Sequence, residues 1–375
     1  MVNIVADDKI PFIRGVLEQY ANICYLPANE ITHQRLTNTD ALVIRTRTKC
    51  NAQLLAETAV KFIVSATIGY DHIDTDYCEK NGIQWANAAG CNASSVKQYV
   101  LAALLWLANK KNFRLQEKTI GIVGVGNVGS KVARMAKMLG MKVLLCDPPR
   151  AKKEQQAKFV MLEELVAAAD IITIHVSLSQ QGADKTYGLF SSRIFSSVKE
   201  GTIIINSSRG EVIDERALKT AIQKKQLSDV ALDVWQSEPN IDRELLNMVT
   251  IATPHIAGYS VDGKAMGTAM SVNALSRFYG WGLDTWFPQS LPTPDNTQLQ
   301  ADFSTATFEH NLHLLVKSTY DIMSDDNRLR TSPNDFERQR GHYPLRREPS
   351  SYTVNAANIS EQDRQRLAAL QFHLT

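Results

Sequence analysis

The fold is decided by residues 119–139, which read TIGIVGVGNVGSKVARMAKML. The apolar run Thr119–Val123 is typical of a buried strand, and Val128–Leu139 has the apolar spacing of a helix. Between them lies a GxGxxG pattern, Gly124-Val125-Gly126-Asn127-Val128-Gly129. Glycine triplets also occur by chance in turns, but the strand before this one and the helix after it give each glycine a defined task.

The pattern predicts a dinucleotide-binding turn. Gly124 permits the tight turn, Gly126 lets the backbone approach a pyrophosphate, and Gly129 lets the helix pack on the strand. Backbone N–H groups at the positive end of the helix, from Asn127 and Val128 onward, would face the phosphates. Asp147 ends the next strand, where its carboxylate can bind ribose hydroxyls and would repel a 2′-phosphate. NAD is therefore favoured over NADP, although the nearby Arg150 weakens this preference; the alternative is a purely structural turn.

Short apolar strands alternate with helical patterns through most of the chain. Six central strands are expected, at Thr119–Val123, Lys142–Cys146, Asp170–His175, Thr202–Asn206, Asp229–Val234 and Val249–Thr253. Helical patterns separate most of them, which predicts a doubly wound parallel α/β sheet of the Rossmann type. A smaller, flavodoxin-like α/β domain is expected near the start, with strands at Asn3–Ala6, Ala41–Arg45, Phe62–Ala66 and Ile83–Ala86 and helices at Phe12–Tyr20 and Thr75–Lys80.

A chain of 375 residues is long enough for two or three domains. Ser94 and Ser95 are expected to cap a long helix that runs to Lys111, and prolines within 283–298 indicate a linker. We expect a substrate-binding lid domain (1–93 plus 258–285), a nucleotide-binding domain (94–257) and a small α+β C-terminal domain (286–375). The last would contain helices at Thr307–Met323 and Ser360–Phe372.

The composition argues against several kinds of partner. With 41 Lys and Arg against 39 Asp and Glu, the net charge of +2 gives no electrostatic reason to bind nucleic acid or an anionic membrane. The five cysteines are scattered and form no CxxC pair, so neither a disulfide framework nor a metal site is expected. No signal peptide and no run of about 18 apolar residues is found, which favours a cytoplasmic protein.

Three polar residues follow the ends of later strands in the central sheet: Arg209, Glu238 and His255. Each alone is unremarkable, because such residues are usually solvated or lie in plain turns. However, the C-terminal ends of parallel strands lie along one edge of a sheet, and the glycine turn lies at that same edge. The sequence therefore places a guanidinium, a carboxylate and an imidazole beside a nicotinamide.

These three side chains suit the oxidation of a 2-hydroxy acid. A neutral His255 imidazole can take the O2 proton near pH 7, and the imidazolium can return it in the reverse direction. Glu238, bonded to the far ring nitrogen, would fix the tautomer and stabilise the imidazolium. Arg209 cannot lose its proton, and it can bridge the C1 carboxylate and O2.

The chain resembles the D-isomer-specific 2-hydroxyacid dehydrogenases along almost its whole length. The motifs that carry the resemblance are the glycine turn, Ser207-Ser208-Arg209-Gly210, residues 233–239 (DVWQSEP) and residues 253–259 (TPHIAGY), together with residues 145–150 (LCDPPR). The resemblance implies that Arg209 and Glu238 are active-site residues, that His255 is the proton donor, and that the C-terminal domain forms a homodimer.

The resemblance also implies which residues bind ligands. NAD contacts would come from Asp147, Val176, Ser207, Ser208, Arg209, Asp233 and Gly258. Substrate contacts would come from Thr46, Thr67 and Tyr259. Val176 stands where Thr is common, so only a backbone contact carries over, whereas Thr46 keeps the hydroxyl of the Ser common there.

The substrate is expected to be a small phosphorylated 2-hydroxy acid. Arg45, Arg47 and Lys49 cluster at the end of a first-domain strand, and Arg346 and Arg347 lie in the tail. Because a phosphate dianion needs such cations, we expect Arg45 and one of Arg346 and Arg347 to bind it. The alternative is an exposed basic cluster with no ligand.

Two other functions are compatible with these residues. A phosphoglycerate dehydrogenase or hydroxypyruvate reductase would keep every residue role and change only the substrate. An NAD-sensing co-repressor built on the same fold would bind the cofactor and retain the three polar residues without turnover.

Overall fold

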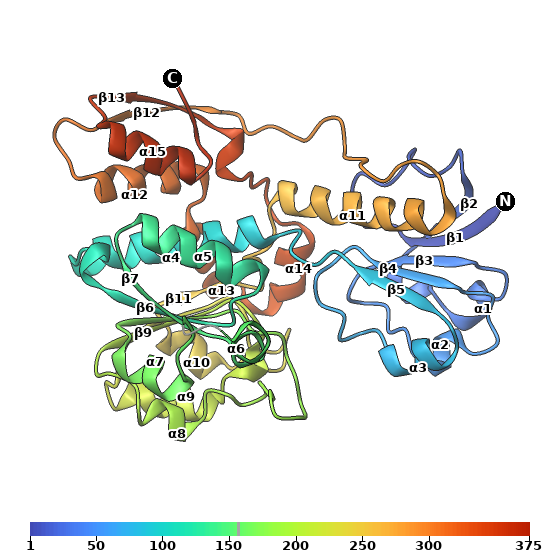
Figure 1. Cartoon of the computed structure of the whole chain (residues 1–375), viewed down its shortest axis with the longest axis horizontal. Coiled ribbons are helices and arrows are strands. Elements are labelled where there is room, and N and C mark those ends of the chain that lie inside the picture. The colour runs from blue at the N-terminus through green and yellow to red at the C-terminus, as the bar shows by residue number, and fades with distance from the viewer. Residues whose placement is uncertain (156–157) are drawn as a thin grey trace. The chain divides into compact units, whose positions relative to one another are not determined.

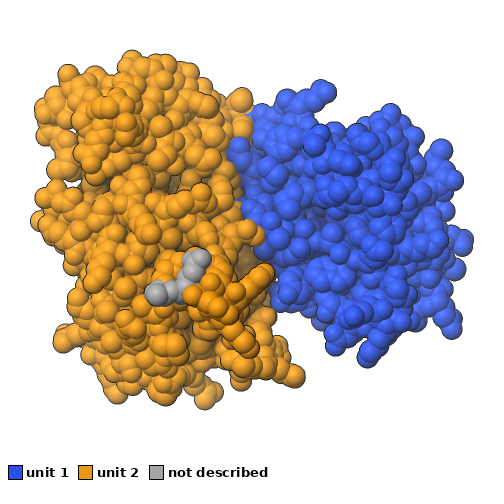
Figure 2. All heavy atoms as spheres, viewed as in Figure 1, with its two compact units in different colours: residues 1–92, 260–292 blue, residues 93–259, 293–375 orange. Residues whose placement is uncertain are grey.

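The computed structural model describes residues 1–155 and 158–375. Their contacts divide the chain into two compact units (Figure 2). Unit 1 consists of Met1–Asn92 and Ser260–Pro292, and unit 2 of Ala93–Tyr259 and Thr293–Thr375. Residues 293–375 therefore group with the nucleotide-binding part, while the expected division into three domains stays a prediction. No helix in the described part of the chain is long and apolar enough to cross a bilayer.

The central sheet of unit 2 is the predicted doubly wound sheet. Its six strands are all parallel, in the order β11-β10-β9-β8-β6-β7: β6 (Thr119–Val123), β7 (Lys142–Cys146), β8 (Ile171–Ile174), β9 (Thr202–Asn206), β10 (Leu227–Leu232) and β11 (Ile251–Ala252). Its connecting helices are α5 (Asn127–Met138), α6 (Pro148–Glu154), α7 (Leu162–Ala168), α8 (Ser192–Phe195), α9 (Glu215–Gln223) and α10 (Arg243–Met248), with 3₁₀ turns η2 (Leu115–Glu117) and η3 (Gly210–Val212). Strand order reverses at β6, the strand that feeds the glycine turn.

Helix α4 (Ala93–Lys111) lies between α5 and the C-terminal helix α12 (Phe308–Thr319) (Figure 1). It is buried on nearly every face because both neighbours pack against it. The expected capping by Ser94 and Ser95 was wrong, since the helix already begins at Ala93. Ser95 instead donates from inside the helix to Glu348, at 2.8 Å.

The C-terminal part of unit 2 shares one hydrophobic core with the central sheet. A parallel three-stranded sheet, β12 (Gln298–Asp302), β13 (Thr353–Ala357) and β14 (His373–Leu374), accompanies α13 (Ile322–Thr331), α14 (Phe336–Gly341), α15 (Glu361–Ala369), η4 (Pro333–Asp335) and η5 (Pro349–Ser351). The single helix expected over Thr307–Met323 is two helices. Tyr320 adopts an extended conformation between them, and Asp321 caps α13 through the Met323 N–H.

Unit 1 has the flavodoxin-like strand order β2-β1-β3-β4-β5, all parallel. Its elements are β1 (Val2–Asp7), β2 (Ala21–Leu26), η1 (Ala28–Glu30), α1 (His33–Leu36), β3 (Ala41–Ile44), α2 (Ala52–Leu55), β4 (Phe62–Ser65), α3 (Thr75–Lys80), β5 (Gln84–Asn87) and α11 (Val261–Tyr279). The helix expected at Phe12–Tyr20 is absent from this described region, because Phe12 and Gly15 have positive φ values of 65° and 79°. Ile13 and Leu17 are nevertheless buried.

Candidate active site

The glycine turn has the geometry that the sequence predicts. Gly124 has a φ of +85°, and a Cβ there would lie 2.6 Å from the carbonyl oxygen of His175, at the end of β8. A Cβ on Gly129 would lie only 2.0 Å from the Gly124 carbonyl oxygen. At Gly126, by contrast, no described atom lies within 4 Å of a built Cβ. Two glycines are thus required by the protein itself, and the third leaves open space in front of the backbone.

Asp147 is held by the glycine turn. It directly follows β7, and its two carboxylate oxygens accept hydrogen bonds from the Val125 N–H (2.7 Å) and the Arg150 N–H (3.0 Å). A carboxylate can accept about four hydrogen bonds, so these two bonds leave acceptor capacity for ribose hydroxyls. The Arg150 guanidinium donates to the Val125 carbonyl and pairs with Glu154. Arg150 therefore braces the turn.

The surroundings of the turn fit a dinucleotide. A pocket of about 400 Å³ is lined by Val125, Gly126, Asn127, Ser130, Lys131, Arg134 and Arg150. Three of these residues are cationic, which suits the charge of a pyrophosphate. The hydroxyl oxygen of Ser207, after β9, is buried without a hydrogen-bond partner in the described part of the chain. Such an orphaned donor is what a contact to a bound cofactor would satisfy.

The other residues expected to contact NAD lie at strand ends of unit 2. Val176 follows β8 and Gly258 lies in the turn after β11, and both are partly exposed. Ser208 is buried, and both its N–H and its hydroxyl donate to the side-chain oxygen of Asn206. Its side chain is therefore occupied within the protein.

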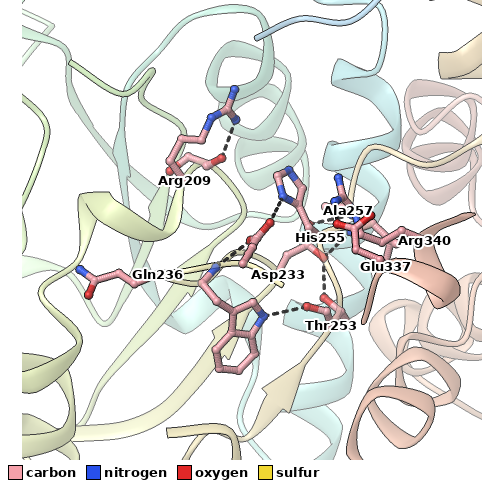
Figure 3. A network of polar contacts seen from close by, with 12 residues as sticks. Arg209, Asp233, Gln236, Thr253, His255, Ala257, Glu337 and Arg340 are labelled. Atoms are coloured by element: carbon pink, nitrogen blue, oxygen red, sulfur yellow. Dashed lines mark hydrogen bonds and ion pairs between the residues drawn. The ribbon is translucent and has the colours of Figure 1, made fainter. Parts of the chain in front are cut away.

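His255 and Glu238 form a hydrogen-bonded pair (Figure 3). The Nδ1 atom of His255 lies 2.7 Å from the Oε2 atom of Glu238, whose Oε1 atom accepts from the Trp235 N–H at 2.9 Å. Burial by itself would raise the pKa of Glu238. The charge of His255 and its hydrogen bond, the Trp235 N–H and the charge of Arg340 outweigh burial and hold that pKa below its usual value. Glu238 is thus kept ionised beside the imidazole.

The turn that carries His255 is anchored by Asp233, a buried residue of 1% exposure directly after β10. Its carboxylate accepts hydrogen bonds from the Ile256 and Ala257 N–H groups, both at 2.8 Å, and from the Thr253 hydroxyl at 2.6 Å. The Asp233 carbonyl accepts from the His255 N–H at 2.7 Å. These bonds hold His255 at a φ of 56°, a conformation that non-glycine residues rarely adopt. The sequence suggested a cofactor contact for Asp233 but gave no sign of this anchoring.

Arg209 lies in the loop after β9, and its guanidinium donates to the Ser208 carbonyl at 2.8 Å. The Asn206 side chain donates to the Arg209 carbonyl at 3.0 Å and so braces the loop. In Figure 3 the side chains of Arg209 and His255 extend from their separate loops toward the same side. Unit 2 thus carries all three residues expected to be catalytic.

The expected substrate residues are divided between the two units. In unit 1, Arg45 forms a two-pronged pair with the fully buried Asp7, at 3.0 Å for each hydrogen bond. Thr46 is exposed, and the Thr67 hydroxyl lies 2.7 Å from that of Ser65. The pairing of Arg45 with Asp7 was not predicted from the sequence. Asp7 ends β1, which lies beside β3, so an acid at that position could have indicated a partner for Arg45.

In unit 2, the Tyr259 ring meets the Tyr343 ring edge-on, at a centroid distance of 5.8 Å. Arg346 is buried, with 3% exposure. It donates to the Ala257 carbonyl and lies 4.4 Å from the Tyr320 ring centroid. Arg347 is also buried, and its carbonyl accepts from Gln98. The sequence gave no signal that α14 would come close to the His255 turn.

Comparison with known proteins points to a dehydrogenase family. The family model "D-isomer specific 2-hydroxyacid dehydrogenase, NAD binding domain" matches residues 93–257. A second model, "Domain of unknown function (DUF3410)", matches residues 290–370. Among solved structures, the NAD⁺-bound 3-phosphoglycerate dehydrogenase of Entamoeba histolytica is 25% identical with a TM-score of 0.65, covering 75% of this chain and 96% of that one.

Two curated relatives match nearly end to end. Erythronate-4-phosphate dehydrogenase of Bacteroides fragilis is 48% identical over 354 residues, which cover 94% of this chain and 99% of that protein. The enzyme of the same name from Photorhabdus laumondii is 40% identical over 376 residues, 99% of both chains. The fold, the site and these matches define an NAD-dependent dehydrogenase of the D-isomer-specific 2-hydroxyacid class, as the resemblance implied. Within that class, the chain belongs to the erythronate-4-phosphate dehydrogenase family.

Proposed function

We propose that this protein oxidises the 2-hydroxyl of 4-phospho-D-erythronate to 2-oxo-3-hydroxy-4-phosphobutanoate, a step in pyridoxal 5′-phosphate (vitamin B6) biosynthesis. The observation that carries the proposal is the 2.7 Å hydrogen bond between His255 and Glu238, at the sheet edge where the glycine turn lies. When bound, NAD accepts the hydride that leaves C2. The nearly full-length similarity to enzymes of this name supports the choice of substrate.

His255 serves as the general base in this direction. With Nδ1–H donated to Glu238, the other ring nitrogen, Nε2, is the acceptor that takes the O2 proton. The ionised Glu238 holds this tautomer and stabilises the imidazolium that forms. General acid–base assistance of this kind typically contributes about 10²–10⁴-fold to the rate.

Arg209 is assigned to the C1 carboxylate and O2 of the substrate, because its planar guanidinium can bridge both. Thr46, Thr67 and Tyr259 are assigned to substrate binding through their hydroxyl groups. Two N–H groups of Arg45 are used by Asp7, which leaves three of its five donors for the phosphate.

The second phosphate ligand is assigned to the tail. Both arginines are buried, and Arg346 donates to the Ala257 carbonyl. The Nε and Nη1 atoms of Arg346 are buried without a hydrogen-bond partner in the described part of the chain, so Arg346 and Arg347 both stay candidates. The proposal also includes a homodimer formed through residues 286–375 and a cytoplasmic location. Both follow the family resemblance.

Turnover of a substrate panel tests the proposed reaction. Purified protein is mixed with NAD and 4-phospho-D-erythronate, 3-phospho-D-glycerate or D-glycerate, with and without a keto acid that can reoxidise NADH. We expect the highest kcat/KM for 4-phospho-D-erythronate, measured by the formation of its own 2-oxo product. In His255→Asn, kcat should fall about 10²–10⁴-fold. Preference for either glycerate would make the protein a different member of the class. NAD binding without any turnover would favour the co-repressor function.

A further inference from the structure

Helix α14 brings an arginine of the C-terminal region close to the His255–Glu238 pair (Figure 3). The fully buried Phe336 anchors this helix in the core of unit 2. Arg340 lies at its end, with its guanidinium carbon 5.7 Å from the Tyr259 ring centroid and 6.0 Å from that of Phe336. In Figure 3 the labelled side chains of Arg340 and Glu337 lie beside His255 and Ala257. Arg340 thus lies beside the turn that carries His255, although the two are far apart in the sequence.

The charge of Arg340 is only partly compensated. Its Nη1 atom pairs with Glu337 Oε1 at 2.8 Å, while its Nε atom is buried without a hydrogen-bond partner in the described part of the chain. The side chain is 17% exposed, so water screens the charge weakly. Burial raises the pKa of Glu238, and the charge of His255 lowers it most. The charge of Arg340 also contributes to lowering it.

We propose that Arg340 is a positioning residue of this active site, which biases the His255–Glu238 pair toward its unprotonated imidazole form and holds the Tyr259 ring. The inference rests on the proposed function. Protonating His255 changes the net charge of the pair from −1 to 0, and a nearby cation favours the more negative state. A cation beside the pair therefore favours the state in which the imidazole is free to accept a proton.

Other charged and titratable groups also face the pair or its turn. From the strands and loops of the sheet these are Arg209 and Asp233, and from α9 Glu215, which accepts the Gln236 N–H at 2.8 Å. From the C-terminal helices and the loop after them they are Glu337, Asp325, Arg328, Tyr343 and Arg346, with Tyr259 in the turn itself. Asp325 is engaged by Arg328 and two tyrosine hydroxyls, and Arg346 by the Ala257 carbonyl. The charge of Arg340 contributes to lowering the pKa of Glu238.

The test compares Arg340→Gln with Arg340→Lys in the full-length protein, by the pH dependence of kcat/KM for hydroxy acid oxidation. In Arg340→Gln, the acidic limb of the profile should move to higher pH by about 0.5–1 unit, because the cation is lost. KM should rise about 3- to 10-fold as Tyr259 loses its support, a change typical of one lost cation–π contact. Arg340→Lys keeps the charge and should keep the limb in place.

Arg338→Gln is the matched control, since Arg338 lies on the same helix and is exposed, with Asp335 as its ion-pair partner. NADH fluorescence titration and thermal unfolding report whether each variant is intact. If Arg340→Gln does not fold, Glu337→Gln tests the same charge from the opposite side and should move the limb to lower pH. An unmoved limb in an intact Arg340→Gln or Glu337→Gln protein overturns the inference.

Failure of the proposed function is recognised separately in the wild-type protein. If wild type shows no acidic limb, or if His255→Asn retains its rate, the function of the pair itself is wrong and the inference is overturned with it. If wild type shows the acidic limb and His255→Asn is inactive, the proposed function stands. The Arg340 variants then test the role of Arg340 by itself.

Discussion

The glycine turn (residues 124–129) and the histidine turn (residues 253–258) lie at the same sheet edge but are held in different ways. The glycine turn is held by its own composition, because Gly124 and Gly129 permit backbone approaches that any side chain would block. The histidine turn contains a strained His255 that Asp233 fixes through hydrogen bonds from another strand. The cofactor-binding part of the site is therefore encoded locally, and the catalytic part depends on residues distant in the chain.

Crowding the glycine turn should have the largest effect. Gly129→Ala places a Cβ 2.0 Å from the Gly124 carbonyl oxygen, so the turn must shift. We expect a loss of about 3 kcal/mol in the free energy of unfolding, as for overpacked cores, and at least about 100-fold weaker NAD binding. Urea denaturation and NADH fluorescence measure the two effects.

Gly126→Ala is the control within the same turn. No described atom lies within 4 Å of its built Cβ, but its φ of −74° and ψ of −148° lie outside the β region. Stability should therefore fall by about 1 kcal/mol, less than in Gly129→Ala. NAD binding should still weaken, because the methyl group fills the space that the pyrophosphate would approach. If both variants bound NAD with wild-type affinity, the glycine turn would not be the pyrophosphate-binding site.

Loosening the histidine turn should have the next largest effect on stability. Asp233→Asn keeps the shape but loses the charge and sets an amide donor against the backbone N–H groups of Ile256 or Ala257. Leaving such buried donors unsatisfied costs about 2–3 kcal/mol, and kcat should fall about 10-fold as His255 loses its fixed position. Asp229→Asn is the control, because Asp229 is also buried, on β10, but it bonds Thr250 and Lys111. It should lose stability without loss of kcat.

This contrast explains what the sequence could predict. Strand and helix positions around the central sheet were predicted well because their apolar periodicity and glycines act over a few residues. Arg209, Glu238 and His255 could be placed at one edge because parallel strands fix the direction of their C-terminal ends. The anchoring role of Asp233 and the approach of α14 could not be predicted, since both are contacts across many residues without a local pattern. The prediction of a helix at Phe12–Tyr20 was wrong although the local pattern was helical. The apolar residues have helical spacing, but the positive φ values of Phe12 and Gly15 interrupt any helix there.

Neutralising Glu238 tests the catalytic pair itself. Glu238→Gln keeps a hydrogen-bond acceptor for His255 but removes the charge that stabilises the imidazolium. We expect kcat to fall about 10²-fold and the acidic limb of the pH profile to move to lower pH. This direction is opposite to that expected for Arg340→Gln. The two variants together therefore distinguish the effect of the Glu238 charge on the acidic limb from that of the Arg340 charge.

Glu238 should also link stability to pH. Its pKa is lower in the folded protein than the ordinary 4.5, so its stabilising effect is complete above that value and is lost as the pH falls through the folded-state pKa. The difference in unfolding free energy between wild type and Glu238→Gln should therefore narrow as the pH falls below 4.5 through the folded-state pKa of Glu238. A difference independent of pH down to the acid-unfolding region would contradict the lowered pKa.

The smallest effect should come from the Thr253 hydroxyl, which lies 2.6 Å from Asp233 and 3.0 Å from the Tyr99 hydroxyl. Thr253→Val removes one of three hydrogen bonds that the Asp233 carboxylate accepts and leaves the two backbone bonds that fix the histidine turn. Stability should fall by about 1–2 kcal/mol. Since the backbone bonds remain, kcat should fall by less than about threefold, and Thr253→Ser, which retains the hydroxyl, should match wild type in kcat. A loss of kcat in Thr253→Val as large as in Asp233→Asn would mean that the hydroxyl, and not the two backbone N–H groups, sets the position of His255.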